Sequence, residues 1–219
     1  MENPQVRINL LTDSRGRDIE TRLLHEIGSS INCEITFNVY PGATLEKLKN
    51  RQTRGLADLT VIIGGICNFT NVHIEGQKRL VTYGLDTRER QEKKDLTKRT
   101  ILDFFENQGN CIVSTIAPAK LTPCERPSLE SEQQALLNDL QEINHFIKEE
   151  SEKRNIKFLN LAKTFYRSSR KRRGKERKTV WRLAEETLPD GVHLNAELKD
   201  RWAKIIATCI KTSLNEAKT

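Results

Sequence analysis

The segment VRINLLTDS (residues 6–14) contains the pattern that decides the fold. Its apolar residues end at Thr12, and residues 18–27 then carry apolar side chains at helical spacing. This order predicts a strand, a turn and a helix. Residues 33–39 repeat the order, because they alternate like a strand, break at Pro41-Gly42 and lead into helical spacing over residues 43–49.

The rest of the chain continues this alternation of strands and helices. Further strands are predicted at residues 59–63, 111–116 and 157–161. Further helices are predicted at residues 88–106, 129–153 and 196–214. Because strands that alternate with helices form βαβ units, we expect one α/β domain over residues 1–219, with a five-stranded parallel sheet between two layers of helices.

Residues that carry chemistry follow the ends of these predicted strands. Ser14 follows the first strand, Gly42 follows the second, and Asp190 and His193 follow the fifth. In open parallel sheets, ligands bind outside the carboxyl ends of the strands. A serine nucleophile, a histidine base and an orienting carboxylate together make a hydrolase site, so Ser14, His193 and Asp190 are candidate catalytic residues. Without the other candidate segments, a helix N-cap would be the better explanation of Ser14.

The segments at residues 12–14, 41–43, 65–68 and 190–195 resemble the four sequence blocks of the SGNH or GDSL hydrolase family. They occur in the same order and span essentially the whole chain. The form Pro-Gly-Ala-Thr-Leu is also similar to esterase-like domains carried by some animal retroelements. The resemblance implies a flavodoxin-like three-layer fold and hydrolysis of a small ester through an acyl-serine intermediate. Such a mechanism calls for no metal and no organic cofactor.

The chain departs from the family pattern in two blocks. Thr12 stands where the family has glycine, and the third block reads Gly-Ile-Cys-Asn where the family has Gly-x-Asn-Asp. Without a gap, Cys67 therefore takes the place of the oxyanion asparagine, although a shift of the loop would let Asn68 point into the site. We expect the oxyanion hole to use the amides of Ser14 and Gly42 with Asn68 or Cys67. Loss of one donor typically costs about 10²–10³ in turnover, so the change predicts a slow enzyme rather than an inactive one.

The net charge of +7 comes from one short segment. Residues 167–178 hold eight basic residues and one acidic residue, so the rest of the chain balances to zero. The basic residues are Arg167, Arg170, Lys171, Arg172, Arg173, Lys175, Arg177 and Lys178. We expect a basic loop inserted into the domain. Such a loop attracts RNA or DNA, covers an anionic membrane surface, serves nuclear import, or is simply a solvated surface segment. A nucleic-acid-binding module with weak or no turnover is therefore the alternative to an esterase.

Composition excludes several other classes of protein. No apolar run approaches the roughly 20 residues that cross a bilayer, and the N-terminus lacks the pattern of a signal peptide. The five cysteines are scattered, without zinc-binding spacing. We therefore expect an intracellular protein, cytoplasmic or nuclear, with no structural metal. The oligomeric state is left open.

Overall fold

The computed structural model describes residues 5–28, 31–51, 57–76, 78–84, 86–107, 110–122, 129–173 and 176–216. Its centre is a parallel sheet in the order β2-β1-β3-β6. The four strands are β1 (Val6–Thr12), β2 (Cys33–Val39), β3 (Leu59–Ile63) and β6 (Cys111–Val113). Strand order reverses between β1 and β3, which is the switch point where ligands bind in open α/β sheets. The predicted three-layer α/β architecture is confirmed.

The prediction of five full strands is wrong in one detail. Instead of a strand over residues 157–161, the described chain has one parallel bridge between Ser114 and Leu159. The reason lies on α4 (Leu129–Lys153), where the carboxamide of Asn144 accepts from the Ile116 amide at 2.6 Å and donates to the Ile116 carbonyl at 2.9 Å. Because the Asn144 side chain bonds both the amide and the carbonyl of Ile116, these groups cannot pair with a neighbouring strand. β6 is therefore shorter than predicted.

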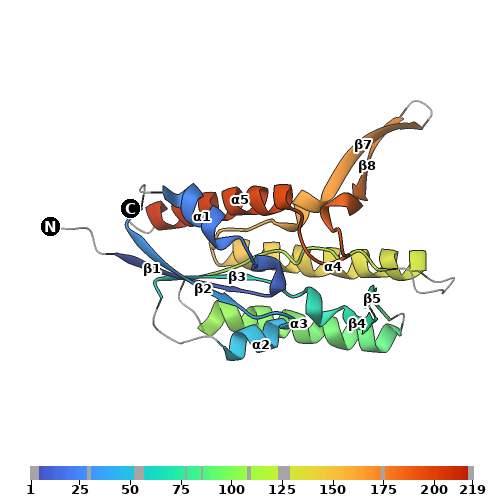
Figure 1. Ribbon diagram of the computed structural model, residues 1–219, viewed down its shortest axis with the longest axis horizontal. Coiled ribbons are helices and arrows are strands. Elements are labelled where there is room, and N and C mark those ends of the chain that lie inside the picture. Colours follow the sequence, from blue (N-terminus) through green and yellow to red (C-terminus); the bar gives the residue numbers. More distant parts are fainter. Residues whose placement is uncertain are drawn as a thin grey trace.

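Helices cover both faces of the sheet (Figure 1). On one face lie α1 (Glu20–Ile27) and α5 (Ala196–Glu216), and the other carries α2 (Leu45–Asn50), α3 (Thr87–Asn107) and α4. Successive residues of β3 point to opposite layers. Val61 packs with the first group and Ile62 with the second, and both are fully buried. This explains why β3 is apolar throughout rather than alternating. No helix within the described ranges is both long and apolar enough to cross a membrane.

Two antiparallel hairpins interrupt the alternation, and neither was expected. The first joins β4 (Asn71–Glu75) to β5 (Lys78–Thr82), and the second joins β7 (Tyr166–Arg173) to β8 (Glu176–Leu183). The predicted basic loop at residues 167–178 is therefore two paired strands, with Lys175 outside the described residues. The pairing is closed at its base, where Tyr166 and Leu183 are opposite each other and pack against the core.

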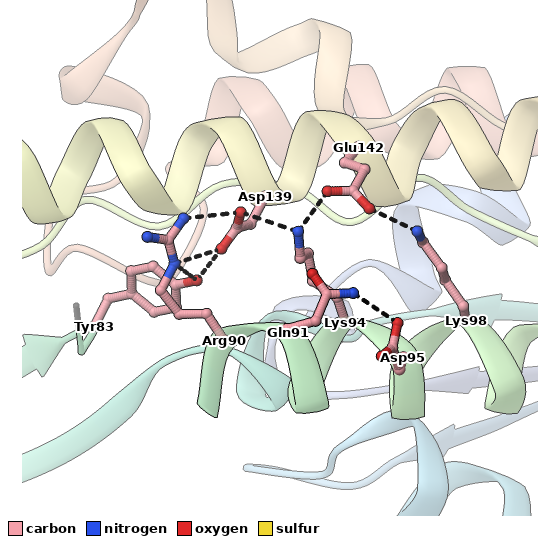
Figure 2. Close-up of polar contacts among 8 residues, drawn as sticks. All are labelled: Tyr83, Arg90, Gln91, Lys94, Asp95, Lys98, Asp139 and Glu142. Carbon is pink, nitrogen blue, oxygen red and sulfur yellow. Dashed lines mark hydrogen bonds and ion pairs between the residues drawn. The ribbon is translucent and has the colours of Figure 1, made fainter. Parts of the chain in front are cut away.

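A network of ion pairs joins α3 to α4 (Figure 2). Asp139 is 4% exposed and receives two hydrogen bonds from the Arg90 guanidinium, at 2.8 and 3.0 Å, and one from the Tyr83 hydroxyl. Lys94 and Lys98 both bind Glu142 one turn further along α4, at 2.6 Å. Burial by itself would raise the pKa of Asp139, but the bonds from Arg90 and Tyr83 outweigh it and hold this pKa below its ordinary value.

Candidate active site

Ser14 lies in a tight turn at the carboxyl end of β1. Residues Ser14–Gly16 form a short 3₁₀ helix, and the carboxylate of Asp13 caps it by accepting from the Arg15 amide at 2.9 Å. The Asp13 amide donates to the Ile63 carbonyl at 3.2 Å, which fixes the turn against the end of β3. Ser14 itself is half-buried. The turn therefore presents Ser14 at the edge of the sheet where strand order reverses.

Arg15 connects this turn to the segment that follows β6. Its side chain is buried, and its guanidinium donates to the carbonyls of Ala117 and Pro118 at 2.6 and 2.7 Å. The guanidinium also lies 5.9 Å from the centre of the Phe165 ring. Sequence reasoning did not single out Arg15, and its only local signal was its position directly after the candidate nucleophile.

Asp190 and His193 form a hydrogen-bonded pair just before α5. The Asp190 Oδ2 atom lies 2.6 Å from His193 Nδ1, and Oδ1 accepts from the amides of Val192 and His193 at 3.1 and 2.7 Å. Burial by itself would raise the pKa of Asp190, but the His193 ring and the two amides outweigh it and lower this pKa to about 2. Because an ionised carboxylate only accepts hydrogen bonds, Nδ1 carries the proton and Nε2 is left as the basic atom of His193.

Gly191 brings this pair against the same segment that Arg15 holds. Its carbonyl accepts from the Lys120 amide at 2.9 Å. Its φ of 82° suits glycine, and a Cβ atom there would lie 2.6 Å from the Lys120 carbonyl oxygen. The segment of residues 117–120 is therefore bound to the Ser14 turn at one end and to the Asp190–His193 loop at the other.

The charged groups of these two loops also influence one another. The pKa of Asp13 is raised by burial, and the Arg15 charge, the Arg15 amide and, when it is protonated, the His193 ring partly oppose that effect. The pKa of Arg15 is lowered by burial, and the neighbouring carboxylates of Asp13 and Asp190 oppose that effect. Both neighbours of Ser14 in the sequence therefore interact with one member of the Asp190–His193 pair. The structure brings together residues from the two ends of the chain.

The second block lies at the carboxyl end of β2. Gly42 is exposed in a turn with a φ of 71°, a conformation that favours glycine. The Tyr40 amide donates to the Thr12 carbonyl at 2.8 Å, so this turn starts beside the end of β1. A surface hollow of about 620 Å³ borders Gly42 and is lined by Tyr40, Pro41, Gly42, Ala43, Lys47, Asn50 and Arg51.

In the third block, the side chains of Cys67 and Asn68 have different surroundings. The Asn68 carboxamide faces the start of α2, where its oxygen accepts from the Leu45 amide at 2.9 Å and its nitrogen donates to the Glu46 carboxylate at 2.9 and 3.0 Å. Cys67 is half-buried, and burial together with the charge of Asp13 raises the pKa of its thiol to about 11. Cys67 is therefore a neutral thiol beside the Ser14 turn, whereas the Asn68 side chain is bound to α2.

The edge of the sheet around Ser14 contains groups that can transfer a proton. Among the described residues, no group of three or more His, Cys, Asp or Glu side chains is placed to hold a metal ion. The basic residues of β7 and β8 lie on the hairpin, whose base at Phe165 and Ala184 adjoins the Arg15 side chain. The groups that meet here are a hydroxyl-bearing turn, an imidazole oriented by a carboxylate, and backbone amides at the ends of β1 and β2.

Comparison with known proteins defines the class of fold. No family model matches the sequence, and no curated protein matches it. Solved structures match over nearly the whole chain, and they include GDSL-like, lipase, acylhydrolase and acetylesterase structures. The chain therefore has the three-layer fold of SGNH and GDSL hydrolases.

Three of these structures illustrate the likeness. A GDSL-like lipase from Bacteroides thetaiotaomicron has a TM-score of 0.59 and 17% identity, covering 99% of this chain and 93% of that chain. An aryl esterase from M. smegmatis has a TM-score of 0.59 and 11% identity, with coverages of 94% and 99%. A carbohydrate acetylesterase from Sinorhizobium meliloti has a TM-score of 0.57 and 12% identity, with coverages of 95% and 99%. At these identities the likeness establishes the fold.

Proposed function

We propose that this protein hydrolyses esters, with Ser14 as the nucleophile, His193 as the general base and Asp190 as the orienting carboxylate. The observation that carries the proposal is the Asp190–His193 pair, whose Oδ2 and Nδ1 atoms lie 2.6 Å apart, on a loop that is hydrogen-bonded to the same 117–120 segment as the Ser14 turn. The fold shared with lipases, an aryl esterase and an acetylesterase supports the same reaction class.

The reaction follows from the protonation states of these groups. The Ser14 oxygen attacks the ester carbonyl carbon while its proton passes to His193 Nε2, and the Asp190 carboxylate stabilises the imidazolium through Nδ1. The tetrahedral intermediate then collapses, the alcohol leaves with the proton from Nε2, and an acyl-serine remains. Water attacks the acyl group with the same base, releases the acid and restores the Ser14 hydroxyl.

Backbone amides at the ends of β1 and β2 are the proposed main donors to the oxyanion. The amides of Ser14 and Gly42 are fixed in turns, so they need little reorganisation when charge develops. The third donor is weaker here than an asparagine, because a neutral thiol is a poor hydrogen-bond donor. The proposal therefore includes slow turnover, and it favours small acyl groups such as acetate with activated alcohols as test substrates.

A fluorophosphonate probe and p-nitrophenyl acetate test this proposal on the full chain. We expect the probe to label one serine and the ester to be cleaved, and we expect Ser14→Ala to abolish both. The matched control is Ser131→Ala, which removes an exposed hydroxyl on α4 and should leave labelling and cleavage unchanged. Absence of labelling in protein that is folded by circular dichroism would refute the proposed function.

A further inference from the structure

The β7–β8 hairpin forms an arm that extends away from the three layers (Figure 1). It is a two-stranded sheet without a third strand among the described residues, and each strand has 8 residues. At about 3.4 Å per residue, each strand spans roughly 27 Å. The base is fixed, because the Ala184 amide donates to the Phe165 carbonyl at 2.7 Å and Arg167 pairs with Glu186.

The register places like charges directly opposite one another along this arm. Arg167 is opposite Arg182, Lys171 is opposite Lys178, and Arg172 is opposite Arg177, whereas the outermost pair, Arg173 and Glu176, has opposite charges. Like charges at directly opposed positions of an antiparallel pair are destabilising, and an isolated two-stranded hairpin is only marginally stable in water. A polyanion bound along the arm would offset this unfavourable order of charges in the register.

Cations occupy register positions on both faces of the arm. Residues with alternate numbers share a face, so Arg167, Lys171 and Arg173 belong to one face and Arg170 and Arg172 to the other. A flat anionic surface, such as a membrane, would neutralise one face of a ribbon. A nucleic-acid groove with phosphates along both walls would neutralise the cations on both faces of the ribbon.

We propose that the β7–β8 arm binds double-stranded nucleic acid through the sugar-phosphate backbone that borders a groove. A B-form major groove is about 12 Å wide and accepts a two-stranded β-ribbon. The cations on both faces and the extension of the arm away from the domain fit a groove better than a membrane surface. This inference does not depend on ester hydrolysis, because the arm and the Ser14 turn are separate parts of the chain.

Binding of a fluorescent 20-base-pair DNA duplex and of an RNA duplex of equal length tests the proposal. The arm variant combines Arg170→Gln, Lys171→Gln, Arg172→Gln and Arg173→Gln. We expect it to bind at least tenfold more weakly than the unaltered chain. We also expect the slope of log K against log salt concentration to fall by about one for each phosphate that the variant no longer neutralises. Binding of the DNA duplex supports the proposal, and comparison with the RNA duplex shows whether the arm distinguishes a B-form from an A-form helix.

A matched control removes the same charge from other exposed positions. It combines Arg88→Gln, Lys148→Gln, Arg201→Gln and Lys204→Gln, which are all exposed. The control should bind as the unaltered chain does, and a variant with Arg170→Lys, Arg172→Lys and Arg173→Lys should keep affinity within about threefold because charge is retained. Thermal melting, which needs no esterase activity, verifies that each variant is folded.

Two results would overturn the proposal. One is equal affinity of the arm variant and the control variant for both duplexes, which would show that net charge alone causes binding. The other is binding to vesicles that contain phosphatidylserine without binding to either duplex, which would assign the arm to a membrane surface. Hydrolysis of p-nitrophenyl acetate measured in parallel reports the proposed function separately.

Discussion

At the scale of single residues, Asn68 and Cys67 have different surroundings although they are adjacent in the sequence. The Asn68 carboxamide joins the third block to α2 through Leu45 and Glu46, and Thr100 donates to the same Glu46 carboxylate at 3.1 Å. Cys67 instead interacts with the charges of Asp13 and Arg15 on either side of Ser14. These contacts favour a structural function for the Asn68 side chain, and its role as an oxyanion donor stays a prediction.

Replacing each residue separates the two roles. Asn68→Ala should lower the free energy of unfolding by about 1–2 kcal/mol, because it removes hydrogen bonds to a backbone amide and to a carboxylate. Its effect on kcat for p-nitrophenyl acetate should stay below about tenfold. The matched variant Cys67→Asn supplies a stronger donor beside the Ser14 turn and should raise kcat. A loss of about 10² in kcat for Asn68→Ala with unchanged stability would instead assign Asn68 to the oxyanion hole.

At the scale of secondary-structure elements, local sequence patterns predicted the bounds of an element when its apolar residues alone define it. The predicted bounds of β2, β3 and α4 match the structure, because β2 and α4 carry their own apolar period and β3 is a continuous β-branched run that stops at Gly64. The end of β6 was not predictable in this way, since it depends on Asn144, 28 residues from Ile116. The contact of Arg15 with Ala117 spans 102 residues, so no local pattern encodes it.

The hairpin at β7–β8 shows a second limit of sequence reasoning. Its basic residues predicted a loop, because charged runs are usually solvated. The pairing of β7 with β8 starts instead at the base of the hairpin, where Tyr166 and Leu183 contact the core. The same register then continues along both strands. By contrast, the positions of Ser14, Asp190 and His193 at one edge of the sheet followed from topology, because carboxyl ends of parallel strands share an edge.

The contact between α3 and α4 should depend on Asp139 far more than on Glu142. Asp139→Asn weakens a buried pair with Arg90, so we expect a loss of about 2 kcal/mol in the free energy of unfolding, measured by urea denaturation at pH 7. The control Glu142→Gln alters a pair whose carboxylate is 43% exposed and should cost less than about 1 kcal/mol. Equal losses for the two variants would contradict this view of the network.

The same network has a defined pH dependence. The pKa of Asp139 is lower in the folded chain than its ordinary value of 3.8, so its stabilising effect is complete above that pH. As pH falls from 3.8 through the lower pKa of the folded carboxylate, the unfolded chain gains its proton first and the contribution is lost. The difference in stability between the unaltered chain and Asp139→Asn should therefore be constant from pH 5 to 7 and shrink in acid.

At the scale of the whole molecule, one sheet separates two apolar layers. Ile206 of α5 belongs to the layer that contains Trp202, and Ile143 of α4 belongs to the opposite layer. Both isoleucines are fully buried. Because β3 contributes Val61 to one layer and Ile62 to the other, loss of packing on either side is transmitted to the shared strand. We therefore expect residues 1–219 to unfold as one domain.

Two mild core substitutions test this cooperativity. In a Trp181→Phe background, Trp202 is the single tryptophan and its fluorescence reports its own layer. Ile143→Val and Ile206→Val should each cost about 1 kcal/mol, and their effects should add because the side chains lie on opposite faces of the sheet. The control Ile74→Val, at a side chain that is 73% exposed, should have no effect. Ile143→Val should shift the Trp202 transition and the far-ultraviolet circular dichroism transition equally. If it moved the dichroism transition and left Trp202 fluorescence unchanged, the two layers would unfold separately and the single-domain prediction would be wrong.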